Sequence, residues 1–221
     1  MRAPDIESAA LHESMQDEQL MLAYAGGDTA AFDVLYGRHE GALYRFVRRL
    51  MGARLSAEVD GVFEDTWLRI VNARESFSPQ GAQWRTWAFT IAHDLAIDRL
   101  RVSGREVAAA AHADDADDFD TAPAVPGRSA QGADEPDLAH PVAEEAAFWR
   151  AAGGRMLECL GELPVDQRSA FLLHHEEGFT VEAMAAALDV NFETVRNRLR
   201  HALDKLRACM DRHLAVLRTR A

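Results

Sequence analysis

Apolar residues recur with helical spacing through the first half of the chain. Intervals of three or four residues place them on one face of a helix, and the strict alternation of a half-buried strand does not occur. Three helices are predicted, over residues 29–51, from near Ser56 to Val71, and from about Trp84 to Arg101. The segment Ser78-Pro79-Gln80-Gly81 predicts a loop before the third helix. The first half is therefore expected to be all-helical.

The second half has the boundary signals of a helix-turn-helix unit. Two helices joined by a turn of three or four residues form this unit in many DNA-binding proteins. Proline in a first turn, glycine after a last turn, and threonine or asparagine as a cap mark helix ends. These signals predict a helix over Val165–Glu177 with Pro164 in its first turn and Gly178 at its end, a helix over Val181–Leu188 capped by Thr180, and a helix from Asn191 to about Met210.

The last predicted helix has one apolar side and one side suited to DNA. Val195, Leu199, Ala202 and Leu206 are spaced by four, three and four residues and are expected to face the core. Arginine can pair with guanine and asparagine with adenine in the major groove, while further basic residues hold phosphates. The outward residues are Glu193, Arg196, Asn197, Arg200 and His201, and Arg198, Lys205 and Arg207 are placed to hold phosphates.

Between the two helical halves lies a stretch rich in Ala, Asp, Gly and Pro. Residues 106–147 hold one basic and 11 acidic side chains, a net charge of −10, whereas the segments before and after carry −3 and +1. The total of −12 is therefore concentrated in one segment and does not argue against nucleic-acid binding elsewhere. We predict a flexible acidic linker over 105–147. It separates a tail (1–16) and a first domain (17–104) from a second domain (148–215).

Size and composition limit the function further. The chain has 221 residues, 48% of them hydrophobic, which is enough for two small cores. It has no apolar run long enough for a membrane span, and its first residues lack the apolar region of a signal peptide. Cys159 and Cys209 lie far apart without metal-ligand spacing. We interpret them as reduced thiols of a cytosolic protein.

Several segments occur in an order that resembles a known family. The first half contains AGGDTAAF (25–32), LYGRH (35–39), VFEDTWLRI (62–70), NARESFSP (72–79), WRTWAFTIA (84–92) and AIDRLR (96–101). The second half contains LPVDQR (163–168) and TVRNRL (194–199). This ordered set resembles the extracytoplasmic-function (ECF) sigma factors of RNA polymerase. Each segment alone is a weak signal, but together they span both halves of the chain.

The resemblance implies an all-α fold of two small helical domains, the second a helix-turn-helix. It implies a sigma factor that binds core RNA polymerase and promoter DNA, has a probable anti-sigma partner, and needs no cofactor, metal or membrane insertion. Residues carried over for the polymerase clamp are Glu64, Asp65, Leu68, Arg69 and Asn72. Those for the promoter −10 element are Asn72, Ser78, Trp84, Arg85, Arg99 and Arg101, with a flipped base held by the loop 72–83. Those for the −35 element are Glu193, Thr194, Arg196, Asn197, Arg198, Arg200 and His201.

Three points stay open at this level. The acidic linker either enters a basic channel of the polymerase or serves only as a solubilising tether. Trp67 and Trp87 are expected in the core, whereas for Trp84 the choice between core packing and contact with DNA stays open. The chain could instead be a helix-turn-helix regulator with an N-terminal sensing domain, which would not need the clamp and −10 segments in order.

We do not expect an enzyme or a pure adaptor. His174, His175, Glu176 and Glu177 could suggest a metal site, but adjacent helical residues point about 100° apart and make poor joint ligands. Common catalytic motifs do not occur in the sequence. An adaptor would leave the outward Arg/Asn face of the last helix unexplained.

Overall fold

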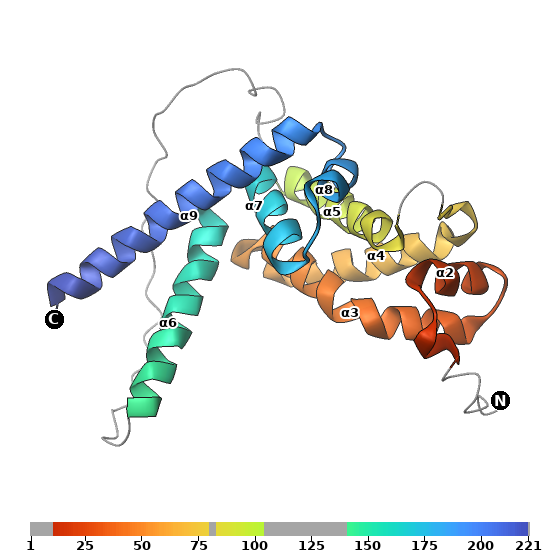
Figure 1. Ribbon diagram of the computed structural model, residues 1–221, viewed down its shortest axis with the longest axis horizontal. Coiled ribbons are helices and arrows are strands. Elements are labelled where there is room, and N and C mark those ends of the chain that lie inside the picture. The colour runs from red at the N-terminus through yellow and green to blue at the C-terminus, as the bar shows by residue number, and fades with distance from the viewer. Residues whose placement is uncertain (1–10, 80–82, 104–140, 221) are drawn as a thin grey trace.

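The structure is a computed structural model that describes residues 11–79, 83–103 and 141–220, with side chains over 11–79, 83–103 and 150–212. Within these ranges every regular element is helical (Figure 1). None of these helices is both long and apolar enough to cross a bilayer. The elements are α2 (Asp17–Ala25), α3 (Thr29–Met51), η1 (Ala53–Glu58), α4 (Val59–Asn72), η2 (Arg74–Ser76), α5 (Trp84–Val102), α6 (Pro141–Glu162), α7 (Val165–Phe171), η4 (Leu172–Glu176), α8 (Val181–Ala187) and α9 (Phe192–Arg220).

Helix α3 is the central element of the N-terminal bundle, which we define as α2 to α5. Helices α2, α4 and α5 all pack against it. The Asp28 side chain caps its start by accepting a hydrogen bond from the Ala30 amide, and Gly52, with φ of +73°, ends it. Its bounds are the predicted 29–51. Its apolar stripe is fully buried at Leu35, Leu43, Phe46, Val47 and Leu50.

The other two helices of the N-terminal bundle also lie close to their predicted positions. Helix α5 begins at Trp84 as predicted and ends at Val102, one residue late. Helix α4 begins at Val59 rather than near Ser56. The 3₁₀ turn η1 occupies the intervening residues and buries Leu55 beneath the bundle. The residues near Ser56 are therefore helical, but in the tighter 3₁₀ geometry.

The C-terminal bundle, α6 to α9, contains the predicted helix-turn-helix. Thr180 caps α8 by accepting from the Ala183 amide at 3.2 Å, and Asn191 caps α9 by accepting from the Thr194 amide at 2.7 Å. Gly178, with φ of +68°, ends the preceding helical segment as predicted. That segment is not uniform, because α7 passes into one π-helical turn, η4, before the glycine.

The C-terminal bundle is longer at both ends than the sequence indicated. Helix α9 continues to Arg220, ten residues past the predicted end. Helix α6 begins at Pro141, so the last residues of the segment predicted as linker are helical. Proline suits the first turn of a helix, which explains why the helix can start there. The rest of the predicted linker, 105–140, lies outside the described residues.

The interpretation of the two cysteines as reduced thiols is wrong in this structure. Cys159 of α6 and Cys209 of α9 form a disulfide, and both residues are buried. The two helices pack side by side and bring the Cα atoms to 5.9 Å, within the range that a disulfide spans. The 50 residues between the cysteines in sequence conceal this proximity.

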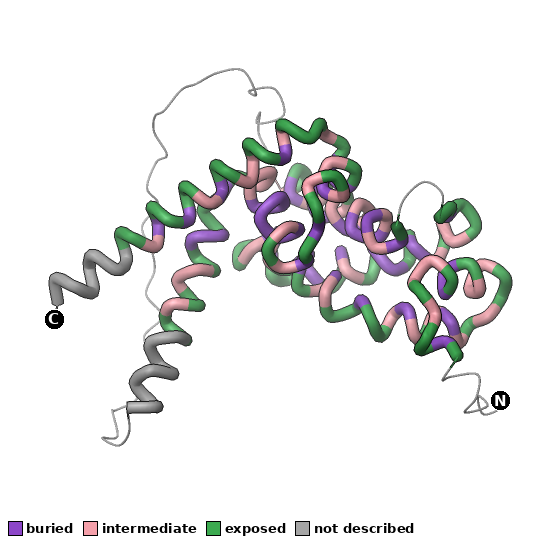
Figure 2. The backbone as a smooth tube through the Cα atoms, viewed as in Figure 1, coloured by how far each residue is buried: buried purple, intermediate pink, exposed green. Residues whose placement is uncertain are grey.

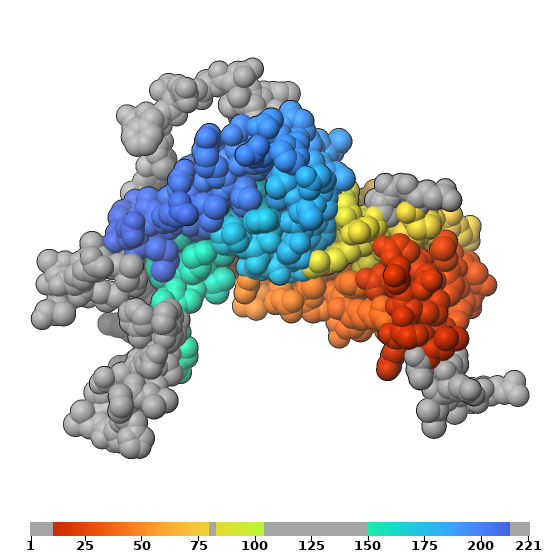
Figure 3. Space-filling model, in the orientation of Figure 1, coloured from red at the N-terminus to blue at the C-terminus, as the bar shows by residue number. Residues whose placement is uncertain are grey.

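The two bundles pack directly against each other. Helix α8 contacts α5, and α7 and η4 contact α3. Buried positions continue from the orange and yellow helices into the cyan ones (Figures 1 and 2), and the space-filling view shows the two bundles in direct contact (Figure 3). We call this contact the seam. The sequence predicted two domains but gave no indication that they share a buried interface.

Candidate functional site

The first turns of α9 present a polar face away from the protein. Val195 and Ala202 are fully buried and Leu206 nearly so, whereas Leu199 is only partly covered. The predicted division of the helix into two sides is therefore confirmed. On the outer side Glu193, Arg196, Asn197, Arg200 and His201 are all exposed. We call these five residues the α9 face.

Arg196 is held in place by its neighbours. Its guanidinium lies 5.7 Å from the centroid of the Phe192 ring and 3.7 Å from a carboxylate oxygen of Glu193. Its side chain is still 61% exposed. A restrained but accessible guanidinium is suited to bidentate contacts with a base or phosphate.

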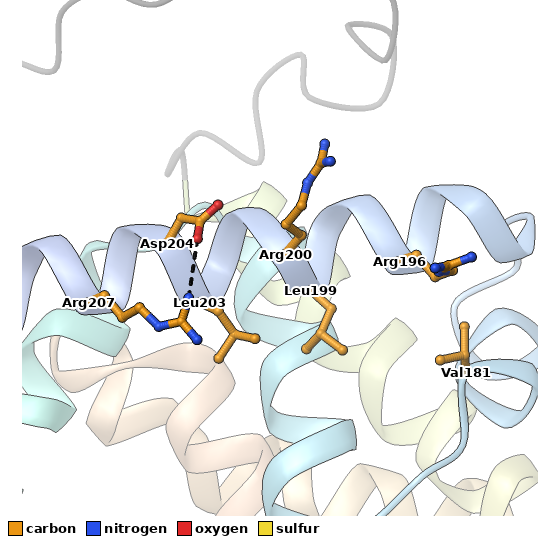
Figure 4. A pocket seen from close by; sticks show the side chains of 7 residues that line it. All are labelled: Val181, Arg196, Leu199, Arg200, Leu203, Asp204 and Arg207. Carbon is orange, nitrogen blue, oxygen red and sulfur yellow. Dashed lines mark ion pairs between the residues drawn. The ribbon is translucent and has the colours of Figure 1, made fainter.

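A shallow groove of about 290 Å³ runs beside this face, between α8 and α9. Its apolar floor is formed by Val181, Leu199 and Leu203. Figure 4 shows Leu199 and Leu203 directed toward the neighbouring helices, while Arg200 points away from them. The groove edge also carries Arg196, Arg207 and Asp204, the last two paired at 3.6 Å. A basic rim over an apolar floor fits a nucleic-acid surface better than a small-molecule cavity, which is usually concave and enclosed.

Two predicted contacts of α9 differ from the expected geometry. Arg198 does not share the α9 face: its side chain is 16% exposed and pairs with Asp166 of α7 at 3.1 Å. In this structure it joins α9 to α7 and is not placed to hold a phosphate. Thr194 is half-buried in the first turn of the helix. Lys205 and Arg207 are exposed, as a phosphate contact requires.

A second exposed face lies on α4. Val62, Thr66, Trp67 and Ile70 are buried, and the Thr66 hydroxyl donates to the Val62 carbonyl at 2.7 Å. The residues predicted to bind polymerase lie opposite. Glu64, Asp65, Leu68, Arg69 and Asn72 are all exposed, and Leu68 is 59% exposed despite being apolar. We call them the α4 face. An exposed leucine ringed by charges is the composition of a protein-docking surface.

The assignment of Trp84 to the −10 element is contradicted by its burial. Trp84 is fully buried, with its ring 4.5 Å from that of His39 and its amide donating to Glu18 at 2.9 Å. Trp67 is buried as predicted. Trp87 is partly buried and packs on Phe77 at 5.3 Å. The −10 role of Trp84 was carried over from the resemblance, and the sequence did not distinguish core packing from a DNA contact.

The remaining residues predicted to contact the −10 element lie on different elements and differ in their exposure and ion pairing. Asn72 and Ser78 are exposed at either end of the described part of the loop, and residues 80–82 lie outside the described chain. Arg101 is 63% exposed, and its nearest carboxylate is Asp98 at 3.6 Å. Arg99 pairs with Glu58 at 3.4 Å. Arg85 is engaged at the seam by Glu177 at 2.7 Å.

Arg168 is a residue of evident structural importance that sequence reasoning did not single out. It is buried, and its guanidinium donates to the carbonyls of Leu50, Gly161 and Leu163 at 2.9, 2.7 and 2.9 Å. Burial lowers its pKa from the usual value. A signal was present, because Arg168 stands three residues after Val165, on the apolar side of its helix.

The four residues that resembled a metal site have other partners. His174 Nδ1 lies 2.9 Å from the Phe179 carbonyl. Glu176 pairs with Arg49 and Glu177 with Arg85, both across the seam. Burial, together with the adjacent His174, lowers the pKa of His175. His174, Glu176 and Glu177 therefore bind separate partners, and His175 is exposed.

Comparisons with known proteins agree with this arrangement. Residues 35–106 match the family described as Sigma-70 region 2, and residues 154–206 match Sigma-70, region 4. These two segments together make up more than half of the chain. The ECF RNA polymerase sigma factor SigK of Mycobacterium sp. (strain JLS) is 26% identical over 86% of this chain and 89% of its own length. SigK of Mycobacterium tuberculosis (strain ATCC 25618 / H37Rv) is 27% identical over 88% and 93%.

Two solved structures share the fold. CnrH, in a complex with the cytosolic domain of CnrY, is 23% identical with a TM-score of 0.58 and covers 88% of this chain and 97% of its own. The sigma factor RpoE, in a complex with the anti-sigma factor NepR from Bartonella quintana, is 22% identical with a TM-score of 0.55 and covers 81% and 96%. Both likenesses extend over the N-terminal and C-terminal bundles together.

Proposed function

We propose a function for this chain, which belongs to the ECF group of the sigma-70 factors. It directs promoter-specific transcription initiation by joining core RNA polymerase to two DNA elements. The observation that carries the proposal is the presence of two exposed faces on one chain. The α4 face has the composition of a protein-docking surface, and the α9 face has the side chains that read base edges.

In this proposal the first domain (17–104) binds the polymerase and opens DNA. Glu64, Asp65, Leu68, Arg69 and Asn72 dock on the clamp of the polymerase. The loop after α4 and the start of α5 then receive the unpaired −10 strand. Strand opening costs stacking and pairing energy, which contacts to unstacked bases offset. Arg85, Arg99 and Arg101 supply positive charge there, with Asn72 and Ser78 at the loop.

The second domain (148–215) reads the −35 element in duplex DNA. A helix fits the major groove, and the α9 face places Arg196 and Asn197 where arginine can pair with guanine and asparagine with adenine. Arg200 and His201 continue the same face by one turn. Arg198 is assigned to the packing of α9 on α7, because its pair with Asp166 occupies it. This domain adds duplex affinity, and core polymerase sets its distance from the first domain.

An anti-sigma factor is the expected protein partner. RpoE, which has the same fold, was solved in a complex with the anti-sigma factor NepR, and we extend this kind of partner to the present chain on that basis. Core polymerase and promoter DNA place the working protein in the cytoplasm. The chain acts by positioning macromolecules and is not proposed to be an enzyme.

Run-off transcription on a promoter library tests the proposal. Core RNA polymerase is assayed with and without the full chain, and the start sites are sequenced. We expect specific initiation from a subset of promoters only when the chain is present. If the chain binds promoters but never stimulates core polymerase, it is a helix-turn-helix regulator and the sigma assignment is wrong.

A further inference from the structure

Two consecutive acidic residues of the C-terminal bundle reach across the seam to two arginines of the N-terminal bundle. Glu176 ends the π turn η4 and pairs with Arg49, in the last turn of α3. Glu177 follows it and pairs with Arg85, in the first turn of α5, at 2.7 Å. The Glu177 side chain is only 3% exposed. A carboxylate removed from water to this degree is stable only when it is paired, so the contact is part of the packed state.

Aromatic rings complete the surroundings of Arg85. Its guanidinium lies 5.0 Å from the ring centroid of Phe179, two residues after Glu177, and 5.5 Å from that of Phe89 on its own helix. The two rings meet across the seam at 5.3 Å. Arg85 therefore has a carboxylate on one side and two aromatic faces on another. These are the same two kinds of contact, anionic and stacking, that an unpaired DNA strand would offer it.

Arg168 adds a contact across the seam at the same C-terminal end of α3. The last carbonyls of a helix have no partner within the helix, and positive charge is favourable beside them. Arg168 of the C-terminal bundle donates to one such carbonyl, that of Leu50 in α3. The same guanidinium serves Gly161 and Leu163 at the end of α6. One buried cation thus caps helix ends from both bundles.

The packed arrangement is too short to read a promoter. The −10 and −35 elements are separated by about 25 base pairs, which is about 85 Å along straight B-form DNA at a rise of about 3.4 Å per pair. Helix α5 packs directly on α8, and α8 packs on α9. Helices in contact lie about 8–10 Å apart, so the two reading elements cannot reach both DNA sites while the seam is intact.

We infer that Glu176 and Glu177, paired with Arg49 and Arg85, form an acidic latch that keeps the free chain closed and inactive. The latch pairs Arg85 with a carboxylate in place of a DNA phosphate. It also keeps the C-terminal bundle, which contains α9, packed against α5. Because Glu177 and Arg85 belong to one chain, DNA that binds Arg85 must displace a carboxylate present at a high effective concentration. Core polymerase would drive the opening by binding the open chain more tightly than the closed one. This inference rests on the proposed sigma function.

Small-angle X-ray scattering of the full chain tests the latch without any transcription assay. We expect a compact wild-type particle and a larger radius of gyration for the double variant Glu176→Gln/Glu177→Gln. Glu158→Gln is the matched control, because Glu158 is 65% exposed and pairs with Arg155 within the C-terminal bundle. Circular dichroism establishes that each variant is folded. An extended wild type, or a folded double variant with the wild-type radius, would overturn the latch.

A charge exchange provides an independent check. Arg85→Glu alone should open the particle, and Arg85→Glu combined with Glu177→Arg should close it again. Failure of the exchange to restore compaction in a folded protein contradicts the pairing. Binding of a fluorescent 20-nucleotide single strand should strengthen about tenfold in the double glutamine variant, since a charge-assisted contact no longer competes. Unchanged binding in an opened particle would contradict the competition at Arg85.

The outcomes separate the latch from the proposed function. Opening in the double variant, without any stimulation of core polymerase, would support the latch and refute the sigma assignment. Specific transcription with an extended wild-type particle would support the sigma assignment and refute the latch.

Discussion

Arg198 of α9 pairs with Asp166 of α7, with 3.1 Å between Arg198 Nη2 and Asp166 Oδ2. Both side chains are mostly covered, at 16% and 21% exposed. The pair joins α9 to α7, which also packs on the N-terminal bundle. Arg198, which the sequence predicted to contact DNA, instead helps to hold the helix that carries the α9 face.

Breaking this pair should loosen the C-terminal bundle. We expect Asp166→Ala to lower the free energy of unfolding by about 1 kcal/mol, because the pair is partly shielded from solvent but not fully buried. Asp204→Ala removes an exposed pair with Arg207 on the same helix and should change stability by less than about 0.5 kcal/mol. Urea unfolding followed by circular dichroism measures both. Equal effects of the two substitutions would show that the buried pair has no special role.

The α9 face predicts how −35 recognition responds to substitution. Arg196→Ala should weaken discrimination at one base position by about 1–3 kcal/mol, the value of a good bidentate contact. Arg212→Ala on the same helix is the control, since Arg212 is 72% exposed but lies 16 residues further along. Selection of bound promoters by the assembled holoenzyme reports the preference at each position. An unchanged preference in Arg196→Ala would show that this side chain does not read bases.

Trp84 should behave as a core residue. Because the side chain is fully buried, Trp84→Ala is expected to lower the free energy of unfolding by about 3–5 kcal/mol. Trp84→Phe keeps an aromatic core and should remain folded with normal affinity for single-stranded DNA. Unfolding curves and fluorescence anisotropy measure the two properties. A folded Trp84→Phe variant that had lost single-strand binding would mean that the indole contacts DNA directly.

The disulfide predicts a difference between oxidised and reduced protein. Closing a 50-residue loop restricts the unfolded chain, which the loop-entropy relation values at about 4 kcal/mol. We therefore expect dithiothreitol to lower the melting temperature of the wild type. The double variant Cys159→Ala/Cys209→Ala should melt lower and be insensitive to the reductant. Trapping of free thiols by alkylation in freshly lysed cells would show which form exists in a reducing compartment.

Asp17 predicts a loss of stability in acid. Burial raises its pKa, but the hydrogen bonds from His39 and Arg38 outweigh burial and leave the pKa below the ordinary 3.8. The folded pKa is therefore lower than the unfolded one, so the stabilisation is complete above about 3.8 and is lost as the pH falls through the folded pKa. Urea unfolding between pH 6 and pH 3 should show a smaller decline for Asp17→Asn than for wild type. The exposed Asp33→Asn serves as the control.

The local elements were predictable because their signals are local. Helix α3 occurs at the predicted residues since one apolar stripe, an aspartate cap and a glycine stop all lie within it. The helix-turn-helix was likewise predicted from Thr180, Asn191 and Gly178. The exposed α9 face followed from the same periodicity, because burying one side of a helix leaves the other in solvent. The α4 face was predicted instead from the resemblance to the ECF sigma factors.

The sequence by itself therefore determined the helices, their faces and the family of the chain. The tertiary structure alone decided which side chains remain accessible: it buried Trp84, paired Arg198 with Asp166, joined Cys159 to Cys209 and paired Arg85 with the buried Glu177. The physical reason is the distance along the chain over which each interaction acts. Helical periodicity and capping act over a few residues, whereas an ion pair or disulfide depends on where distant segments meet, and no pattern within either segment records its partner.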